Sequence, residues 1–101
     1  MTFDFHPEAR KEFYDASHWY EDRSIFAGDR FVKSVRAAVE AIMADPLRHQ
    51  PVGDGVRVFR LKKYPIRLYY SFDGSAEVIR IYAVMHEKRR PDYWRGRVQS
   101  G

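Results

Sequence analysis

The stretch IRLYYSFDGSAEVIRIYAVMH (residues 66–86) contains two runs of β-branched and aromatic residues around a short polar segment. Residues 66–72 and 77–85 are predicted to be strands, because such residues favour the pleated backbone of a sheet. The segment at 73–75 is short enough for a hairpin turn. Working back along the chain, residues 56–61 read as a further strand that reaches the hairpin through a turn at 62–65. The second half of the chain is therefore predicted to be a sheet.

The first half of the chain predicts a short strand at residues 2–6 and then two helices. Pro7 suits a first helical position, and apolar residues continue at helical spacing to about Arg23. A second helix is predicted from about residue 25 to 44, and the Pro- and Gly-rich residues 47–55 are predicted to form a loop. The order β-α-α-β-β-β predicts an α+β fold in one domain, residues 1–101. In this fold an N-terminal helical hairpin packs on a mainly antiparallel sheet.

Strand parity assigns the side chains of the sheet to two faces. The face predicted to meet the helices carries Ile66, Leu68, Tyr70, Phe72, Ile79, Ile81, Ala83 and Met85. The opposite face is predicted to be basic and aromatic, with Arg60, Arg67, Tyr69, Ser71, Arg80, Tyr82, Val84 and His86. Such a face suits RNA, because guanidinium groups pair with phosphates and rings stack on bases. The alternative is a solvated face whose long side chains cover apolar surface.

The composition excludes several classes of protein. The 101 residues include no Cys, which excludes a disulfide scaffold, a Cys-based zinc site and a thiol nucleophile. The chain is too short for a barrel enzyme or a dinucleotide-binding fold. A hydrophobic fraction of 45% argues against disorder. No apolar run is long enough for a membrane span or a secretory signal, so we expect a cytoplasmic protein with no membrane partner.

The net charge of +4 is distributed unevenly along the chain. Residues 1–50 carry seven basic and nine acidic residues (−2), whereas residues 51–101 carry eleven and five (+6). This asymmetry predicts a polyanion or an acidic protein segment as partner, with solubility as the plain alternative. His6, His18 and His49 share no spacing with carboxylates, so no metal site is predicted. Nothing in the sequence calls for a cofactor.

The densest basic stretch is HEKRRPDYWRGR (residues 86–97), in which five Lys or Arg residues surround Tyr93 and Trp94. Together with VRVFRL (56–61) and YPIRLYY (64–70), it resembles the RelE/ParE superfamily of toxins. These toxins belong to type II toxin–antitoxin systems of bacteria and are also described as plasmid stabilisation system proteins. The resemblance covers nearly the whole chain. The ending Ala-Val-x-His-x-x-Arg-Arg-Pro-x-Tyr-Trp is nearer to ParE-like members.

The resemblance implies one of two growth-inhibiting activities. RelE-like members cut messenger RNA in the ribosomal A site, with Lys and Arg on the sheet and a Tyr near the C-terminus. ParE-like members inhibit DNA gyrase. Matching the Arg-Leu-x-Tyr strand places the strand arginine of the RelE-like members on Arg67, and their two strand lysines on Arg60 and Val58. Tyr93 is the candidate for the terminal Tyr.

Metal-independent RNA cleavage needs groups that move protons as well as cations that stabilise the phosphorane-like transition state. Arg60 keeps the charge but is a poor proton carrier, and Val58 does neither job. His86 is a candidate acid or base. The candidate catalytic set of a ribonuclease is therefore Arg60, Arg67, His86 and Tyr93. Because this set is incomplete, the favoured prediction is a ParE-like gyrase inhibitor, and the alternatives are a RelE-like ribonuclease and an inactive member that only binds its antitoxin.

The resemblance also implies a cognate antitoxin that wraps an acidic segment around the toxin and forms a toxin–antitoxin hetero-oligomer. A disordered acidic partner can cover a large surface and neutralise its charge. Its docking surface is expected on the +6 half, including the groove between helices and sheet. The candidate residues for binding RNA or this partner are Arg57, Arg60, Arg67, Arg80, Arg89, Arg90, Arg95 and Arg97.

Overall fold

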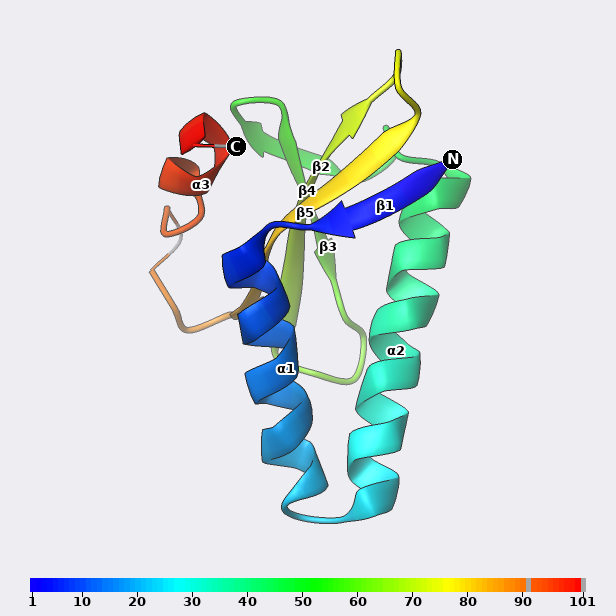
Figure 1. Ribbon diagram of the computed structural model, residues 1–101, viewed down its shortest axis with the longest axis vertical. Coiled ribbons are helices and arrows are strands. Elements are labelled where there is room, and N and C mark those ends of the chain that lie inside the picture. The colour runs from blue at the N-terminus through cyan, green and yellow to red at the C-terminus, as the bar shows by residue number, and fades with distance from the viewer. Residues whose placement is uncertain (91, 101) are drawn as a thin grey trace.

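The computed structural model describes residues 1–90 and 92–100 and shows a helical hairpin beside a five-stranded sheet (Figure 1). The helices are α1 (Pro7–Glu21), α2 (Ile25–Ala44) and α3 (Arg95–Ser100). The strands are β1 (Thr2–Phe5), β2 (Gln50–Gly53), β3 (Val56–Arg60), β4 (Ile66–Asp73) and β5 (Val78–His86). The predicted α+β fold is confirmed. Pro91 of the basic stretch and Gly101 at the end of the predicted domain lie outside the described residues.

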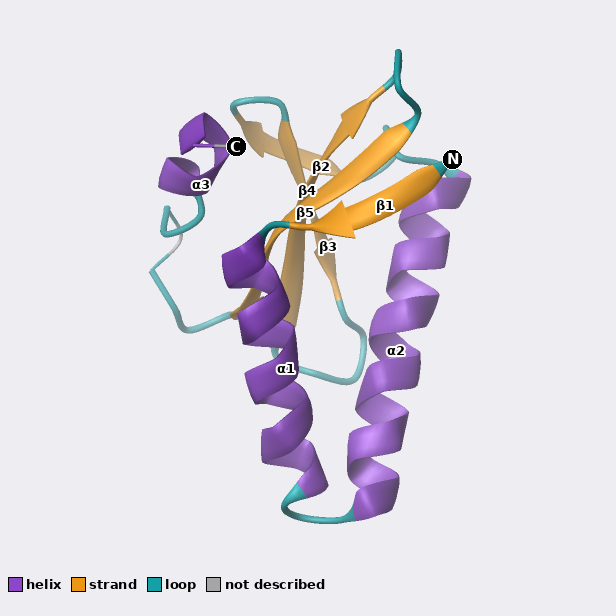
Figure 2. Cartoon of the chain, in the orientation of Figure 1, coloured by secondary structure: helices purple, strands orange, loops and turns teal. Residues whose placement is uncertain are grey.

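The sheet has the order β1-β5-β4-β3-β2. The pairs β5-β4, β4-β3 and β3-β2 are antiparallel, whereas β1 runs parallel to β5. The first strand therefore lies beside the last one, at the edge of the sheet that faces the viewer in Figure 2. This placement leads the chain directly from the sheet edge into α1.

Local capping explains where the two helices of the hairpin begin. His6 caps α1, because its Nδ1 accepts the backbone N–H of Glu8 at 3.1 Å. Ser24 caps α2 in the same way, through the N–H of Phe26 at 3.1 Å. Gly28 lies so close to α1 that a Cβ there would be 3.0 Å from the Cβ of Glu21. A small residue at this position allows the two helices to approach each other near the connection.

The main core lies between the helical hairpin and the sheet. The buried members from the helices are Ala9, Phe31, Val35, Ala38, Val39 and Ile42. They meet Leu61, Ile66, Leu68, Tyr70, Ile79, Ile81 and Val84 from the sheet side. The predicted placement of Ile66, Leu68, Tyr70, Ile79 and Ile81 is confirmed, and Phe72 packs partly buried against the same cluster.

The predicted faces of the last four residues of β5 are wrong. Tyr69 pairs with Ala83 but Tyr70 pairs with Ile81, so Tyr82 is an extra residue in β5, a β-bulge. Beyond the bulge the parity is reversed, since one inserted residue moves every following side chain to the other face. Val84 and His86 therefore lie on the helix side, and Ala83 and Met85 on the other side.

The predicted loop at residues 47–55 is also corrected, because residues 50–53 form the edge strand β2. Pro51 cannot donate a backbone hydrogen bond, which is tolerated at a sheet edge. The pairing with β3 shifts register between Pro51 and Gly53. Residues 53–55 all have positive φ and turn the chain into β3. The Pro and Gly residues that suggested a loop are thus those of an irregular edge hairpin.

A second core covers the opposite face of the sheet, where the C-terminal segment packs. Trp94, just before α3, is 1% exposed, and its ring stacks on Tyr69 with centroids 5.5 Å apart. The cluster also contains Val56, Val58, Tyr82, Ala83 and Met85. The C-terminal segment therefore covers part of the face that was expected to be open.

Replacing Trp94 by Ala is expected to lower the free energy of unfolding by about 3–5 kcal/mol, because a buried indole leaves a large cavity. Tyr93 is the neighbouring residue and is 39% exposed, so Tyr93→Ala is the matched control and is expected to cost only about 1 kcal/mol. Urea unfolding followed by circular dichroism measures both. Equal losses for the two variants would contradict the placement of Trp94.

Candidate functional site

The carboxylate of Glu12, on α1, holds together three parts of the chain. Its Oε1 accepts the backbone N–H of Val84 in β5 at 3.0 Å. Both of its oxygens accept from the guanidinium of Arg97 in α3, at 2.8 Å each. Arg89 adds a further contact to Oε2 at 3.1 Å. The helical hairpin, the sheet and the C-terminal segment thus meet at one side chain.

The pair of Glu12 and Arg97 is largely removed from solvent, with side chains 13% and 8% exposed. Arg97 also donates to the carbonyl of Tyr82 at the bulge, at 2.9 Å. Burial disfavours the charged guanidinium, but the hydrogen bonds and the negative charge of Glu12 outweigh it and raise the pKa of Arg97. This bidentate arrangement makes Arg97 a structural residue of the tail.

Four of the other predicted arginines also have partners within the chain, whereas Arg90 is exposed and makes no ion pair with the described side chains. Arg95 donates to Asp54 at 2.7 Å, to Asp92 at 3.0 Å and to the carbonyl of Val52 at 2.9 Å. Hydrogen bonds to the two carboxylates raise its pKa. Arg57 donates to the carbonyl of His49 at 2.7 Å, and Arg80 donates to Asp4 at 3.2 Å. The guanidinium of Arg89 lies over the ring of Tyr93, 3.6 Å from its centroid.

Arg60 and Arg67 are different, because they lie directly opposite each other on β3 and β4. Within residues 1–90 and 92–98, no carboxylate lies within ion-pairing distance of either guanidinium. The Nε of Arg67 is buried and has no hydrogen-bond partner in this part of the chain. Both arginines line a cavity of about 180 Å³ beside Tyr69 and Trp94. Asp92 and Arg95 also line this cavity. Like charges directly opposite each other on neighbouring strands are unfavourable in a sheet.

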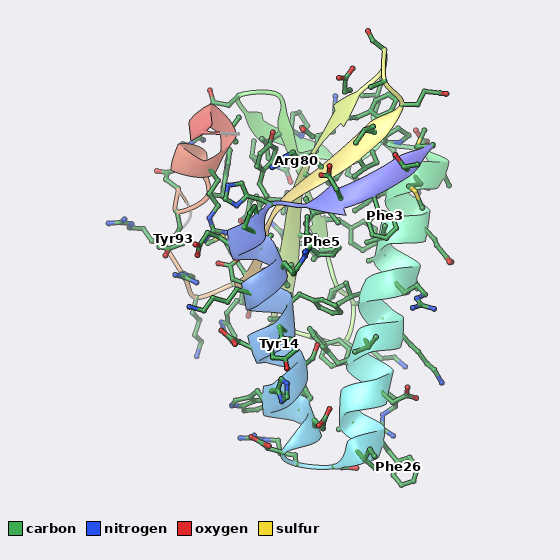
Figure 3. The ribbon with its side chains drawn as sticks, in the orientation of Figure 1. Phe3, Phe5, Tyr14, Phe26, Arg80 and Tyr93 are labelled. Atoms are coloured by element: carbon green, nitrogen blue, oxygen red, sulfur yellow. The ribbon has the colours of Figure 1, made fainter. Side chains whose placement is uncertain are left out.

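The candidate proton carriers do not join these two arginines. His86 pairs with Ile66 and so lies on the helix side of the sheet, whereas Arg67 pairs with Met85 on the other side. Tyr93 projects from the C-terminal segment, at the left of the molecule (Figure 3), and its ring contacts the guanidinium groups of Arg89 and Arg97. The four residues of the candidate catalytic set therefore do not share one site.

A basic groove lies between α2 and the turn that joins β3 to β4. It has a volume of about 820 Å³ and a floor of small and apolar side chains. The cationic residues that line it are Arg30, Lys33, Arg48, Lys62 and Lys63. A second hollow of about 360 Å³ shares Lys62 and Lys63 with the groove and continues to Arg60 and Arg67. We call these seven cationic residues the basic track.

Sequence reasoning placed a docking surface in the groove between helices and sheet but named none of the five cations that line the groove. Arg30 and Lys33 on α2, and Arg48 after it, belong to the half of the chain with a net charge of −2. A net charge summed along the chain conceals residues that the fold brings together. A basic face with small residues could have been predicted on α2 from the helical spacing of four residues, namely Arg30, Lys33, Ala37 and Ala41.

The fold is shared with a toxin–antitoxin protein of known structure. A structure described as the chromosomal ParDE TA system from P. aeruginosa superposes with a TM-score of 0.57 and 22% sequence identity. The match covers 85% of this chain and 95% of that chain. At this identity the similarity establishes the fold. No curated protein matches the sequence.

The family follows from the sequence itself. The family described as "ParE toxin of type II toxin-antitoxin system, parDE" matches residues 3–91. The chain therefore belongs to the ParE toxin family, and the predicted resemblance is confirmed. In the part of the chain that the structure describes, no helix is long and apolar enough to cross a membrane.

Replacing Glu12 by Gln is expected to lower the free energy of unfolding by about 3 kcal/mol, because the buried charge of Arg97 loses its counterion. Asp4→Asn removes the more exposed pair with Arg80 and is expected to cost less than about 1 kcal/mol. Chemical denaturation measures both losses. Equal losses for the two variants would show that the contacts of Glu12 stabilise the fold no more than an exposed ion pair does.

His6 gives the fold a pH dependence. Burial, then the charges of Arg80 and Arg97, lower the pKa of His6 below 6.5, so the folded state favours the neutral ring that caps α1. Its contribution to stability is present above about pH 6.5 and is lost as the pH falls through the lowered pKa. His6→Asn keeps a capping acceptor without titrating, and its loss of stability between about pH 7.5 and 5 is expected to be smaller than that of the native chain. Equal losses in thermal or urea unfolding would contradict this role.

Proposed function

We propose that this ParE-family toxin inhibits DNA gyrase and is neutralised by a cognate antitoxin. The observation that carries the proposal is the bulge at Tyr82, which separates His86 from Arg67. A general acid or base must lie within hydrogen-bond reach of the proton that it moves. The side chains that a ribonuclease would need lie apart, so binding to a protein target is the better supported activity.

Val58 supports the same proposal. It takes the place of one strand lysine of the ribonucleases, and it is buried in the second core beside Tyr69 and Trp94. Arg60, in the place of the other lysine, carries a guanidinium, which is a poor proton carrier. Arg60 and Arg67 can hold an anion but do not supply the two proton transfers of RNA cleavage.

The test compares the two activities of the superfamily with one preparation of the purified chain. We expect it to inhibit the supercoiling of relaxed plasmid by gyrase and to leave ribosome-bound messenger RNA intact. Cleavage of messenger RNA with normal supercoiling would favour the ribonuclease and overturn the proposal. Activity in neither assay would favour a member that only binds its antitoxin.

The antitoxin is proposed to lay an acidic segment along the basic track. The track combines cations on its rim with Ala37, Ala38 and Ala41 on its floor, where a partner backbone can approach α2 closely. Arg89, Arg95 and the buried Arg97 are held by carboxylates of the chain itself, so they are less available to a partner. Six of the seven cations of the track have no carboxylate partner among the described side chains, and the seventh, Lys33, pairs with Asp29 on the exposed surface of α2 at 2.9 Å.

Reversing the charge of Lys62 and Lys63 together to Glu is expected to weaken binding of the antitoxin by at least about tenfold, because two attractive contacts become repulsive. The paired substitution Arg60→Glu with Arg67→Glu is expected to act in the same direction. Lys11→Glu, on the exposed surface of α1, is the matched control and is expected to bind normally. Calorimetric titration with the antitoxin from the adjoining reading frame measures the affinities independently of gyrase. Unchanged affinity for both reversed pairs would refute this placement.

A further inference from the structure

The outer edge of β1 has backbone groups that no strand of the described residues pairs with. The N–H of Thr2 donates to the carbonyl of Glu77 at 3.1 Å, and that of His6 donates to the carbonyl of Ile81 at 2.8 Å. Backbone groups alternate in direction along a strand, so those of Phe3 and Phe5 point away from β5. β1 is the last strand on this side of the sheet, and no other described segment runs along its outer side in Figure 2. An open edge of this kind is a template for pairing with another strand.

An apolar groove lies beside this edge. Phe3 and Phe5 point from β1 toward the helical hairpin (Figure 3) and line a hollow of about 430 Å³ against α2. Val35, Val39 and Met43 form its helical wall. Phe3 remains 45% exposed. An exposed phenylalanine beside unpaired backbone groups marks an interaction surface.

The rim of the groove carries one cation and one anion from α2. Arg36 and Glu40 lie one helical turn apart on α2, and both are exposed. Neither makes an ion pair with any other side chain in the described part of the chain. A two-fold axis would set Arg36 against Glu40 of the partner subunit, and Glu40 against the partner's Arg36. A surface that complements itself in this way suits a second copy of the same chain.

We propose that this edge forms a homodimer in which β1 pairs antiparallel with β1 of a second copy. Because the backbone groups of Phe3 and Phe5 point outward, the two-fold axis of this strand pair can pass at Asp4 or at Phe3. An axis at Asp4 sets two carboxylates directly opposite each other, which is unfavourable. An axis at Phe3 instead sets Thr2 opposite the partner's Asp4, where the hydroxyl can donate to the carboxylate. The two sheets then join into one continuous sheet, with the Phe3 rings packed across the axis.

Charge reversal on the rim provides a specific test. Arg36→Glu and Glu40→Arg each turn two attractive contacts into two repulsive ones, so each variant alone is expected to dimerise at least about tenfold more weakly than the native chain. An equimolar mixture of the two variants is expected to dimerise again, because the carboxylate introduced in one variant then meets the guanidinium introduced in the other. Lys11→Glu, on the exposed surface of α1 and outside this groove, is the control. Sedimentation velocity over about 5 to 500 µM chain measures the association.

Amide hydrogen exchange locates the interface. In the proposed dimer the amides of Phe3 and Phe5 gain protection as the chain concentration rises, whereas the control amide of Ser75, in the β4–β5 turn, does not change. A native chain that stays monomeric over this range would overturn the proposal. Protection of Phe3 and Phe5 only after the antitoxin is added would also overturn it, and would assign the edge to a strand of that partner. Dimerisation that is insensitive to both charge reversals would place the interface elsewhere.

Discussion

The arrangement of the layers depends on the hydrogen bonds that the carboxylate of Glu12 accepts from β5 and from the C-terminal segment. β1 ends at Phe5, and from there onward β5 has no neighbouring strand on that side in the described part of the chain. Glu12 supplies the acceptor that the N–H of Val84 would otherwise lack, and the same group neutralises the buried Arg97. One acidic side chain thus completes the edge of the sheet and attaches the C-terminal segment. The second core beneath that segment, with Trp94 at its centre, depends on the attachment.

This arrangement divides the positive charge of the molecule into two classes. Arg89, Arg95 and Arg97 stabilise the fold through carboxylates of the chain, so their charge is largely neutralised. Arg60 and Arg67 have no such counterion among the described residues, and they continue the line of cations beside α2. The surface available to an acidic partner therefore depends on where the fold places its cations and on whether a carboxylate of the chain already holds them. The number of basic residues along the sequence does not determine it.

The sequence was sufficient to predict the layers, because each helix and long strand has a strong period and clear boundaries. Proline and glycine at residues 51–55 concealed β2, since an irregular edge strand has the composition of a loop. The bulge was not predictable, because Tyr82 lies in an unbroken run of β-formers and only the register with β4 reveals the insertion. The groove was predicted, but its cations on α2 were not. They belong to the half of the chain with a net negative charge, and only the fold places them beside the cations of the other half. The ion pairs of the tail likewise depend on contacts between residues far apart in sequence.

The bulge in β5 has a consequence for how such toxins can diversify. Substitution changes one side chain at a time, but the loss or gain of one residue at position 82 would exchange the faces of residues 83–86 together. In such a strand, the exposed imidazole of His86 could move in this way from the helix side of the sheet to the face that carries Arg60 and Arg67. Alternative activities on one scaffold can therefore be separated by a single insertion or deletion, a kind of change that comparison of residue identities alone does not detect.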